Sequence, residues 1–204
     1  MIGVVDYGLG NVQAFLTAYR RMNIPAFAAK TPDELSKASK VILPGVGSFD
    51  HAMDLLNQSG LKDPLLAQAK SGDVPILGVC VGMQILADGS DEGVAPGLGL
   101  VPGRVRTLVS LSNSSQLPMP HMGWNDVQPV EGMPLFAGLE DAPRFYFLHS
   151  YFYDCAHETD VAAHVTYGQA FTCAVRRDNV FGVQFHPEKS HDFGSRLLRN
   201  FAEL

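Results

Sequence analysis

The stretch VPILGVCVGMQIL, from Val74 to Leu86, contains no charged residue and carries a cysteine at its centre. The part before the cysteine is mostly apolar, which is typical of a strand buried on both faces of a sheet. Within Gly78-Val79-Cys80-Val81-Gly82, the cysteine then stands where this strand gives way to a predicted helix. Free cysteines are among the most buried residue types, so a core position for Cys80 is the first alternative to a reactive one.

Strand-like and helix-like segments alternate before and through this stretch. Strands are predicted at residues 2–6, 26–29, 40–44 and 74–80. Apolar residues recur at helical spacing from Val12, and Thr31-Pro32-Asp33-Glu34 has the order of an N-cap, a first-turn proline and acidic first-turn residues. One or two further helices, divided near Gly60, precede the quoted stretch. Strands that are apolar on both faces and alternate with helices indicate a parallel sheet.

The second half of the chain has a different pattern. Strand-like segments follow one another with few helices between them: RVRTLV, WNDVQPV, RFYFLHSYF, VAAHVTY, AFTCAVRR and VFGVQF. These are predicted to be additional antiparallel strands, and residues 190–204 a closing helix. We therefore predict an α/β fold, with a mostly parallel central sheet flanked by helices and additional antiparallel strands in the C-terminal half. Residues 1–204 are expected to form a single domain.

Composition excludes several classes of function. Lys+Arg 15 against Asp+Glu 21 gives a formal net charge of −6, and no basic cluster is present, so no nucleic-acid partner is expected. The apolar run at 74–87 is shorter than the roughly 18 residues of a membrane span, and the start MIGVVDYG has no basic leader. We therefore expect no membrane association and a cytoplasmic location. Because Cys80, Cys155 and Cys173 include no CxxC pair, neither a metal site nor a disulfide framework is expected.

Cys80 has the surroundings of a nucleophile at a strand-to-helix turn. A Gly-x-nucleophile-x-Gly turn needs small neighbours, because the nucleophile's backbone is strained and its side chain is pushed out of the sheet. Gly78 and Gly82 leave that room. The start of the following helix offers free N–H groups and a positive dipole end, which favour a thiolate. Ligands of open α/β sheets also bind at the carboxyl ends of the strands.

A cysteine nucleophile needs a base, and His186 has the clearest context among the histidines. VFGVQFHPE is predicted to be a strand that ends at His186-Pro187-Glu188, because proline has no N–H with which to continue the pairing. Glu188 lies two positions on, so in extended backbone it can share a side with His186 and orient the imidazole. Taken alone, such a motif is more often an exposed strand end with a surface ion pair.

Glycines also follow the third predicted strand, in LPGVGSF from Leu43 to Phe49. At such a turn backbone N–H groups can approach a ligand closely and form an oxyanion hole, although a glycine pair alone is more often a tight turn. A phosphate-binding loop is not indicated, because the chain has neither GxxxxGK[ST] nor GxGxxG.

Taken together, PGVGSF, GVCVGMQIL and GVQFHPEKS occur in an order and at separations that resemble the class I, or triad, glutamine amidotransferases. VVDYGLGNV, GLGLVPGRV and PHMGWNDV are similar to segments of the glutaminase subunits of imidazole glycerol phosphate synthase, an enzyme of histidine biosynthesis. The similarity runs from Ile2 into the C-terminal helix. One departure is Val81, where leucine is more often expected after the nucleophile.

The resemblance implies a Cys-His-Glu triad and no metal or cofactor. Cys80 would attack the side-chain amide carbon of L-glutamine, His186 would take the thiol proton and later protonate the departing ammonia, and Glu188 would orient His186. A glutamyl thioester would form and be hydrolysed to glutamate. The resemblance further implies that N–H groups of Val46, Gly47 and Val81 form the oxyanion hole. It also implies that glutamine is contacted by Gly47, Gln84, Glu92, His149, Ser150 and Tyr151.

The resemblance also implies a partner protein. The ammonia would pass to a separate (β/α)8-barrel cyclase subunit, in a heterodimer, and the cyclase would make imidazole glycerol phosphate and an aminoimidazole carboxamide ribotide. The candidates for the partner contact or the ammonia route are His121, Met122, Gly123, Trp124 and Asn125. For Trp124 an ordinary core position is the alternative, because tryptophans are highly buried on average.

Three other interpretations are compatible with parts of the pattern. A glutaminase subunit of another synthase, such as pyridoxal phosphate synthase, would keep the triad but not PHMGWN. A peptidase or γ-glutamyl hydrolase of the same architecture would be active without a partner. A regulatory subunit with an inactive site is disfavoured by the intact Cys80, His186 and Glu188. The polar segment from Ser110 to Pro118 is longer than the family needs and has no assigned role.

Overall fold

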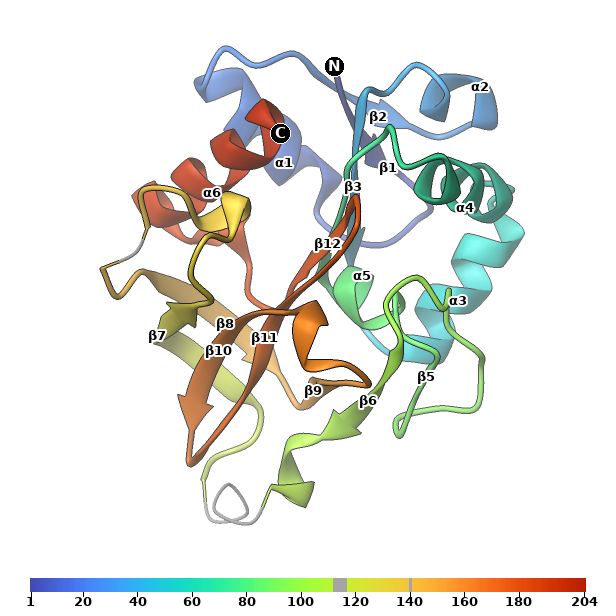
Figure 1. The fold of residues 1–204 in the computed structure, drawn as a ribbon. Helices are drawn as coiled ribbons and strands as arrows, with labels where there is room; N and C mark the ends of the chain where they lie inside the picture. The colour runs from blue at the N-terminus through green and yellow to red at the C-terminus, as the bar shows by residue number, and fades with distance from the viewer. Residues whose placement is uncertain (112–116, 140) are drawn as a thin grey trace.

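The computed structural model describes residues 1–111, 117–139 and 141–204, and its centre is a mixed β-sheet (Figure 1). Mostly buried apolar segments form its parallel part, as the alternating pattern predicts. Its strands lie in the order β2, β1, β3, β4, β12. They are β1 (Ile2–Val5), β2 (Ala26–Ala29), β3 (Lys40–Gly45), β4 (Ile76–Cys80) and β12 (Val180–Val183).

Helices cover both faces of these strands. Figure 1 shows α1 and α6 on one side and α3 and α4 on the other. Asn11 and Thr31 cap α1 and α2, as their side chains accept from the N–H groups of Ala14 and Glu34. Gly60, at φ +74°, separates α3 from α4. The helices are α1 (Val12–Arg21), α2 (Pro32–Leu35), α3 (Phe49–Gln58), α4 (Lys62–Ser71), α5 (Val81–Gln84) and α6 (His191–Glu203).

Antiparallel strands extend the sheet beyond β12, in the order β11, β10, β7, β8. A side branch is formed by β9, which pairs with β11 and β6, and by β5, which pairs with β6 in parallel. The strands are β5 (Gly89–Ser90), β6 (Gly103–Thr107), β7 (His121–Pro129), β8 (Arg144–His149), β9 (Tyr151–Cys155), β10 (Val161–Tyr167) and β11 (Gln169–Arg177).

Two expectations for the second half were wrong in detail. VFGVQF is not simply another antiparallel strand, because β12 pairs in parallel with β4 and antiparallel with β11. It ends at Val183 rather than His186, since the N–H of His186 instead donates to Tyr146 O on β8 at 2.9 Å. RFYFLHSYF forms two strands, β8 and β9, because the chain turns at Ser150. Such long-range pairings leave no mark in local periodicity.

The register of the parallel strands defines the position of the site. Gly45 of β3 pairs with Cys80 of β4, and Val183 of β12 pairs with Val79. The turn after β3, the cysteine and the segment after β12 therefore meet at the carboxyl edge of the sheet. None of the helices formed by the described residues has the length and apolarity needed to cross a membrane. Of the polar segment from Ser110 to Pro118, residues 112–116 lie outside the described residues.

Candidate active site

Cys80 occupies a strained backbone conformation at the end of β4, with φ 55° and ψ −116°. Such a conformation costs roughly 1–3 kcal/mol in a residue that has a Cβ, and the surrounding structure must impose it. Glycines make the close packing possible. A Cβ at Gly82 would meet Leu43 O, one at Gly78 would meet Gly82 O, and one at Gly45 would meet Gly82 N. The turn therefore has the small neighbours that the sequence predicts for a nucleophile.

The helix after Cys80 is shorter than expected. α5 contains four residues, Val81–Gln84, so the helix dipole expected to favour the thiolate is that of a single turn. The other two cysteines lie outside the pocket, in the antiparallel half. Burial raises the pKa of Cys155 to about 12, with a further contribution from Asp160, and burial also raises the pKa of Cys173. Neither has the surroundings of a reactive thiol.

His186 lies between a thiol and a carboxylate. Its Nδ1 is 2.8 Å from Glu188 Oε1, and its side chain lines the same pocket as Cys80. Burial lowers the pKa of His186, but the hydrogen bonds to Cys80 and Glu188 and the charges of both groups outweigh burial and raise it to about 9. Because Nδ1 faces Glu188, Nε2 remains for the exchange of a proton with the thiol. The histidine is thus both oriented and stabilised in its charged form.

The backbone around His186 is also held in place. Ser190 Oγ donates to His186 O at 2.6 Å and accepts from Tyr146 N at 3.0 Å. Glu188 is nearly buried, and its second oxygen, Oε2, has no hydrogen-bond partner among the described residues. One carboxylate oxygen therefore faces the imidazole, and no described donor competes with it.

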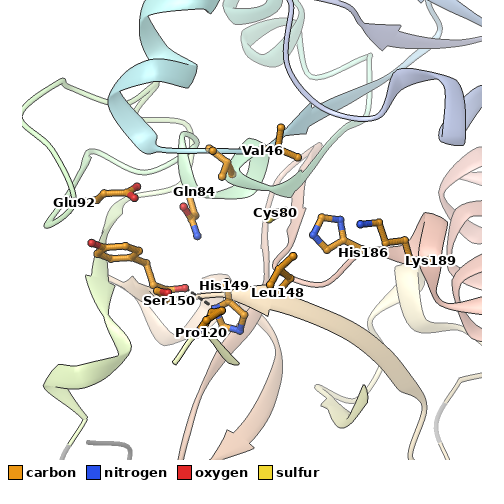
Figure 2. A pocket seen from close by; sticks show the side chains of 13 residues that line it. Val46, Cys80, Gln84, Glu92, Pro120, Leu148, His149, Ser150, His186 and Lys189 are labelled. Atoms are coloured by element: carbon orange, nitrogen blue, oxygen red, sulfur yellow. Dashed lines mark hydrogen bonds between the residues drawn. The ribbon is translucent and has the colours of Figure 1, made fainter. Parts of the chain in front are cut away.

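Cys80 and His186 open onto a pocket with a volume of about 280 Å³. Figure 2 shows Gln84 and Glu92 on one side of Cys80, and His186 and Lys189 on the other. A pocket of this size suits a small metabolite. All the predicted catalytic and glutamine-binding residues line it except Glu188, which lies behind His186; the lining residues are Val46, Gly47, Cys80, Val81, Gln84, Glu92, Pro120, Leu148, His149, Ser150, Tyr151, His186 and Lys189.

The turn after β3 lies against this pocket. Val46 is exposed, at 42% of its surface, and Gly47 has φ +86° with no atom within 4 Å of the position that a Cβ would take. Gly45 pairs with Cys80 across the two strands, so Val46 and Gly47 directly follow the residue that is level with the nucleophile. The predicted oxyanion-hole residues Val46, Gly47 and Val81 are thus brought together around Cys80.

Glu92 has a structural contact that the sequence did not indicate. Its Oε2 accepts from the N–H of Phe49, the first residue of α3, at 2.8 Å. Ser48, at the N-cap position, makes no side-chain cap bond, so Glu92 supplies the cap from 43 residues away. In return, Asp50 accepts from the N–H groups of Val94 and Ala95. Glu92 therefore both lines the pocket and attaches its loop to α3.

Sequence reasoning missed Gln184. Its side chain is fully buried, its Nε2 lies 3.8 Å from Cys80 Sγ, and its Oε1 accepts from Gln84 Nε2 at 3.0 Å. The signal was a polar residue at the end of the apolar run VFGV, two positions before His186. Its proximity to Cys80 follows from the β4–β12 register, which the sequence alone does not give.

Two members of PHMGWN, His121 and Asn125, belong to a hydrogen-bonded series that reaches the pocket. Asn125 Nδ2 donates to Thr166 O and lies 3.2 Å from His121 Nε2. His121 Nδ1 is 2.8 Å from His149 Nε2, and His149 Nδ1 is 2.7 Å from Tyr151 O. Because the two carbonyl oxygens can only accept, each histidine carries its proton on Nδ1. Burial lowers the pKa of His121 to about 4 and, together with the charge of His121, that of His149 to about 3.

The other members of this motif face outward. Met122 is 64% exposed and Trp124 40% exposed, which excludes an ordinary core position for the tryptophan. Trp124 stacks on His191, with ring centroids 5.3 Å apart. Met122 pairs with Leu148 on β8, which is 38% exposed and also lines the pocket. We call Met122, Trp124 and Leu148 the apolar patch. Gly123, at φ +131°, lies between its first two members.

Comparisons with known proteins agree with these features. The family model of glutamine amidotransferase class-I matches residues 4–204. The chain is 57% identical over 204 residues to imidazole glycerol phosphate synthase subunit HisH of Bdellovibrio bacteriovorus, and 50% identical to the subunit of the same name from Leptospira interrogans. Each comparison covers 100% of both chains.

Solved structures show the same fold. A crystal structure of a glutamine amidotransferase has a TM-score of 0.76 at 22% identity, and the structure of PurLQS from Thermotoga maritima has a TM-score of 0.74 at 19% identity. In both cases the match covers 99% of this chain and 97% of the other. At these identities the likeness concerns the fold alone.

Proposed function

Because the chain belongs to the class-I glutamine amidotransferase family, we propose that it is the glutaminase subunit of an imidazole glycerol phosphate synthase in histidine biosynthesis. The observation that carries the proposal is the meeting of Cys80, His186 and Glu188 at one pocket, in a chain 57% identical along its whole length to such a subunit. Residues 1–204 act as one catalytic domain in this proposal.

In the proposed reaction Cys80 is the nucleophile. Its proton passes to His186 Nε2 before the attack, because the raised pKa of the imidazole favours its charged form. The thiolate Sγ then attacks the side-chain amide carbon of L-glutamine, and the carbonyl π electrons move to the oxygen. When the tetrahedral intermediate collapses, the C–N bond breaks and His186 returns the proton to the leaving nitrogen, which departs as ammonia. Water then attacks the glutamyl thioester with His186 as base, and glutamate and free Cys80 are released.

The remaining pocket residues bind the substrate and stabilise its charge. N–H groups of the Val46–Gly47 turn and of Val81 hold the oxyanion, because these residues line the pocket together with Cys80. Gln84, Glu92 and the His149-Ser150-Tyr151 turn contact glutamine. Val46 also offers a means of control, since the glycines on either side of it let its peptide unit rotate at little steric cost.

The proposed partner is a (β/α)8-barrel cyclase subunit that forms a heterodimer with this chain. The apolar patch is the docking surface, because it is exposed and reaches the pocket through Leu148. Ammonia passes from the pocket to the cyclase, which makes imidazole glycerol phosphate and an aminoimidazole carboxamide ribotide. A cytoplasmic location follows from this biosynthetic role and suits three free cysteines.

Glutamine hydrolysis by the purified chain tests the proposal. The assay is run without the cyclase subunit, with it, and with it and its nucleotide substrate. We expect slow turnover alone and at least roughly 100-fold faster turnover in the complete mixture, as expected when one oxyanion donor is gained. Cys80→Ala serves as the inactive control. Equal rates in all three mixtures would exclude control by the partner, and absence of hydrolysis in all three would exclude the function.

A further inference from the structure

Gln184 is a fully buried polar side chain beside the nucleophile. It directly follows β12, whose register pairs Val183 with Val79, so the next position reaches the level of Cys80. Its Nε2 donates to Cys80 Sγ at 3.8 Å, and its Oε1 accepts from Gln84 Nε2 at 3.0 Å. An amide engaged at both ends is held in one orientation, with its N–H toward the sulfur.

This arrangement favours the charged form of the sulfur. Once the thiol proton has moved to His186, Cys80 is an anion, and a hydrogen bond to an anion is roughly twice as strong as one between neutral groups. The preceding strand provides no further charge, and α5 contributes the dipole of one turn. A fixed N–H in a buried site therefore acts on the thiolate more than on the thiol.

We propose that Gln184 is a catalytic hydrogen-bond donor that stabilises the Cys80 thiolate, and that Gln84 orients it from the pocket side. The proposal rests on the proposed function in taking Cys80 as the nucleophile. It gives Gln84 a second role, since one of its N–H groups is engaged by Gln184 while the residue lines the glutamine pocket. Hydrogen bonds through the side-chain amides of Gln184 and Gln84 thereby connect Cys80 to the glutamine pocket.

The rate of alkylation of Cys80 by iodoacetamide, measured from pH 5 to pH 10 by mass spectrometry of the peptide that contains it, tests this role. Gln184→Met keeps the length of the side chain and removes the donor. We expect its rate at neutral pH to fall roughly tenfold, as for the loss of one hydrogen bond to a charged group. The pH of the half-maximal rate should rise by about one unit, and the rates should converge at high pH where the thiol is fully ionised.

Two further variants complete the comparison. Gln184→Glu places a carboxylate beside the sulfur and should move the half-maximal pH higher than Gln184→Met does. Gln68→Met is the matched control, because Gln68 is a half-buried glutamine on α4 that donates to Leu35 O. It should have the wild-type profile. An unshifted profile in Gln184→Met, or a rate lowered equally at every pH, would overturn the proposal.

A measurement on the unaltered chain does not depend on whether the variants fold. The side-chain amide protons of Gln184 should shift in NMR spectra with the same pH midpoint as the alkylation of Cys80, and that shift should vanish in Cys80→Ala. Amide signals that ignore this midpoint would overturn the proposal. Alkylation and NMR need neither glutamine nor a partner, so a chain that failed to hydrolyse glutamine would contradict the proposed function without affecting this test.

Discussion

His186 and the pair His121–His149 are buried in the same molecule, yet their environments shift their pKa values in opposite directions. His186 lies at the carboxyl end of the parallel strands, where burial is outweighed by Cys80 and Glu188, and its pKa rises to about 9. His121 and His149 lie on the antiparallel β7 and β8, where burial dominates and lowers the pKa values to about 4 and about 3. Burial alone therefore does not decide the charge of a histidine; an adjacent anion does.

Removing the charged histidine should have the largest effect. His186→Asn deletes the proposed base, and glutamine hydrolysis in the presence of the cyclase should fall by about 10⁶-fold, as for loss of the base in a triad enzyme. His121→Phe, which replaces a neutral ring stacked between Phe147 and Tyr167, should keep the rate within about tenfold because the triad is intact. Steady-state rates of the two variants decide this. Similar losses would show that the two regions do not differ in function.

Removing the anion is the next test. Glu188→Gln keeps the shape of the side chain but not its charge, so the pKa of His186 should fall and glutamine hydrolysis should drop by about 10⁴-fold.

The same variant should change how stability depends on pH. Because the pKa of His186 is higher in the folded chain than in the unfolded chain, its protonation stabilises the fold fully below about pH 6.5. This contribution is lost as the pH rises through about 9. In Glu188→Gln the free energy of unfolding should depend less on pH over that interval. Denaturant unfolding at several pH values measures it, and a slope equal to that of the wild type would contradict the assignment.

Two equally exposed apolar residues, one on β7 and one just after it, allow a sharper comparison within the antiparallel region. Trp124→Ala should weaken binding of the cyclase subunit by roughly 30-fold, because aromatic residues at the centre of an interface often contribute 2 kcal/mol or more. Val130→Ala is the control, since Val130 is also 40% exposed but lies beyond the far end of β7. Calorimetric titration with the cyclase compares them. If wild type and Trp124→Ala bound the cyclase with equal affinity, the assignment of the apolar patch to the interface would be wrong.

The smallest expected effect concerns acid stability. His121 and His149 are neutral in the folded chain, so stability should fall as the pH drops below about 6.5 and the unfolded chain takes up protons first. His121→Phe removes one of the two groups and should reduce that slope by about half. It should also cost roughly 1–3 kcal/mol at pH 7, because His149 Nε2 loses its donor.

The control for acid stability is His51→Gln, which replaces an exposed histidine on α3. Chemical unfolding between pH 4 and pH 8 gives the slope for each protein. If His121→Phe and His51→Gln both retained the wild-type slope, the low pKa of His121 would be refuted.

The fold and part of the site could be predicted because their signals are local. The Cys80 turn, the His186-Pro187-Glu188 segment and the glycine turn after β3 are each short motifs whose chemistry depends on neighbours in sequence. The strands β1 to β4 were visible as apolar runs, whereas the parallel pairing of β12 with β4 was not foreseen. The expected helix after Cys80 exists but is a single turn, because the chain leaves the helical conformation after Gln84.

The remaining features depend on residues far apart in sequence. Gln184 reaches Cys80 only through the pairing of β12 with β4, and Glu92 reaches α3 across 43 positions. The contact between His121 and His149 requires the β7–β8 register, in which the two residues are direct partners. Spacing along the chain contains no record of such pairings, so the sequence could identify these residues individually but not what they contact.

The series of hydrogen bonds from Asn125 through His121 and His149 to Tyr151 has a consequence for proton conduction. A relay of the hopping kind requires every link to reverse its donor and acceptor after each transfer. Both outer acceptors here, Thr166 O and Tyr151 O, are peptide carbonyls that have no proton to release. His121 also lies between two aromatic rings, which hinders its rotation. This series of hydrogen bonds therefore does not conduct protons. It holds the wall of the pocket in place, and ammonia formed at Cys80 cannot gain a proton along it.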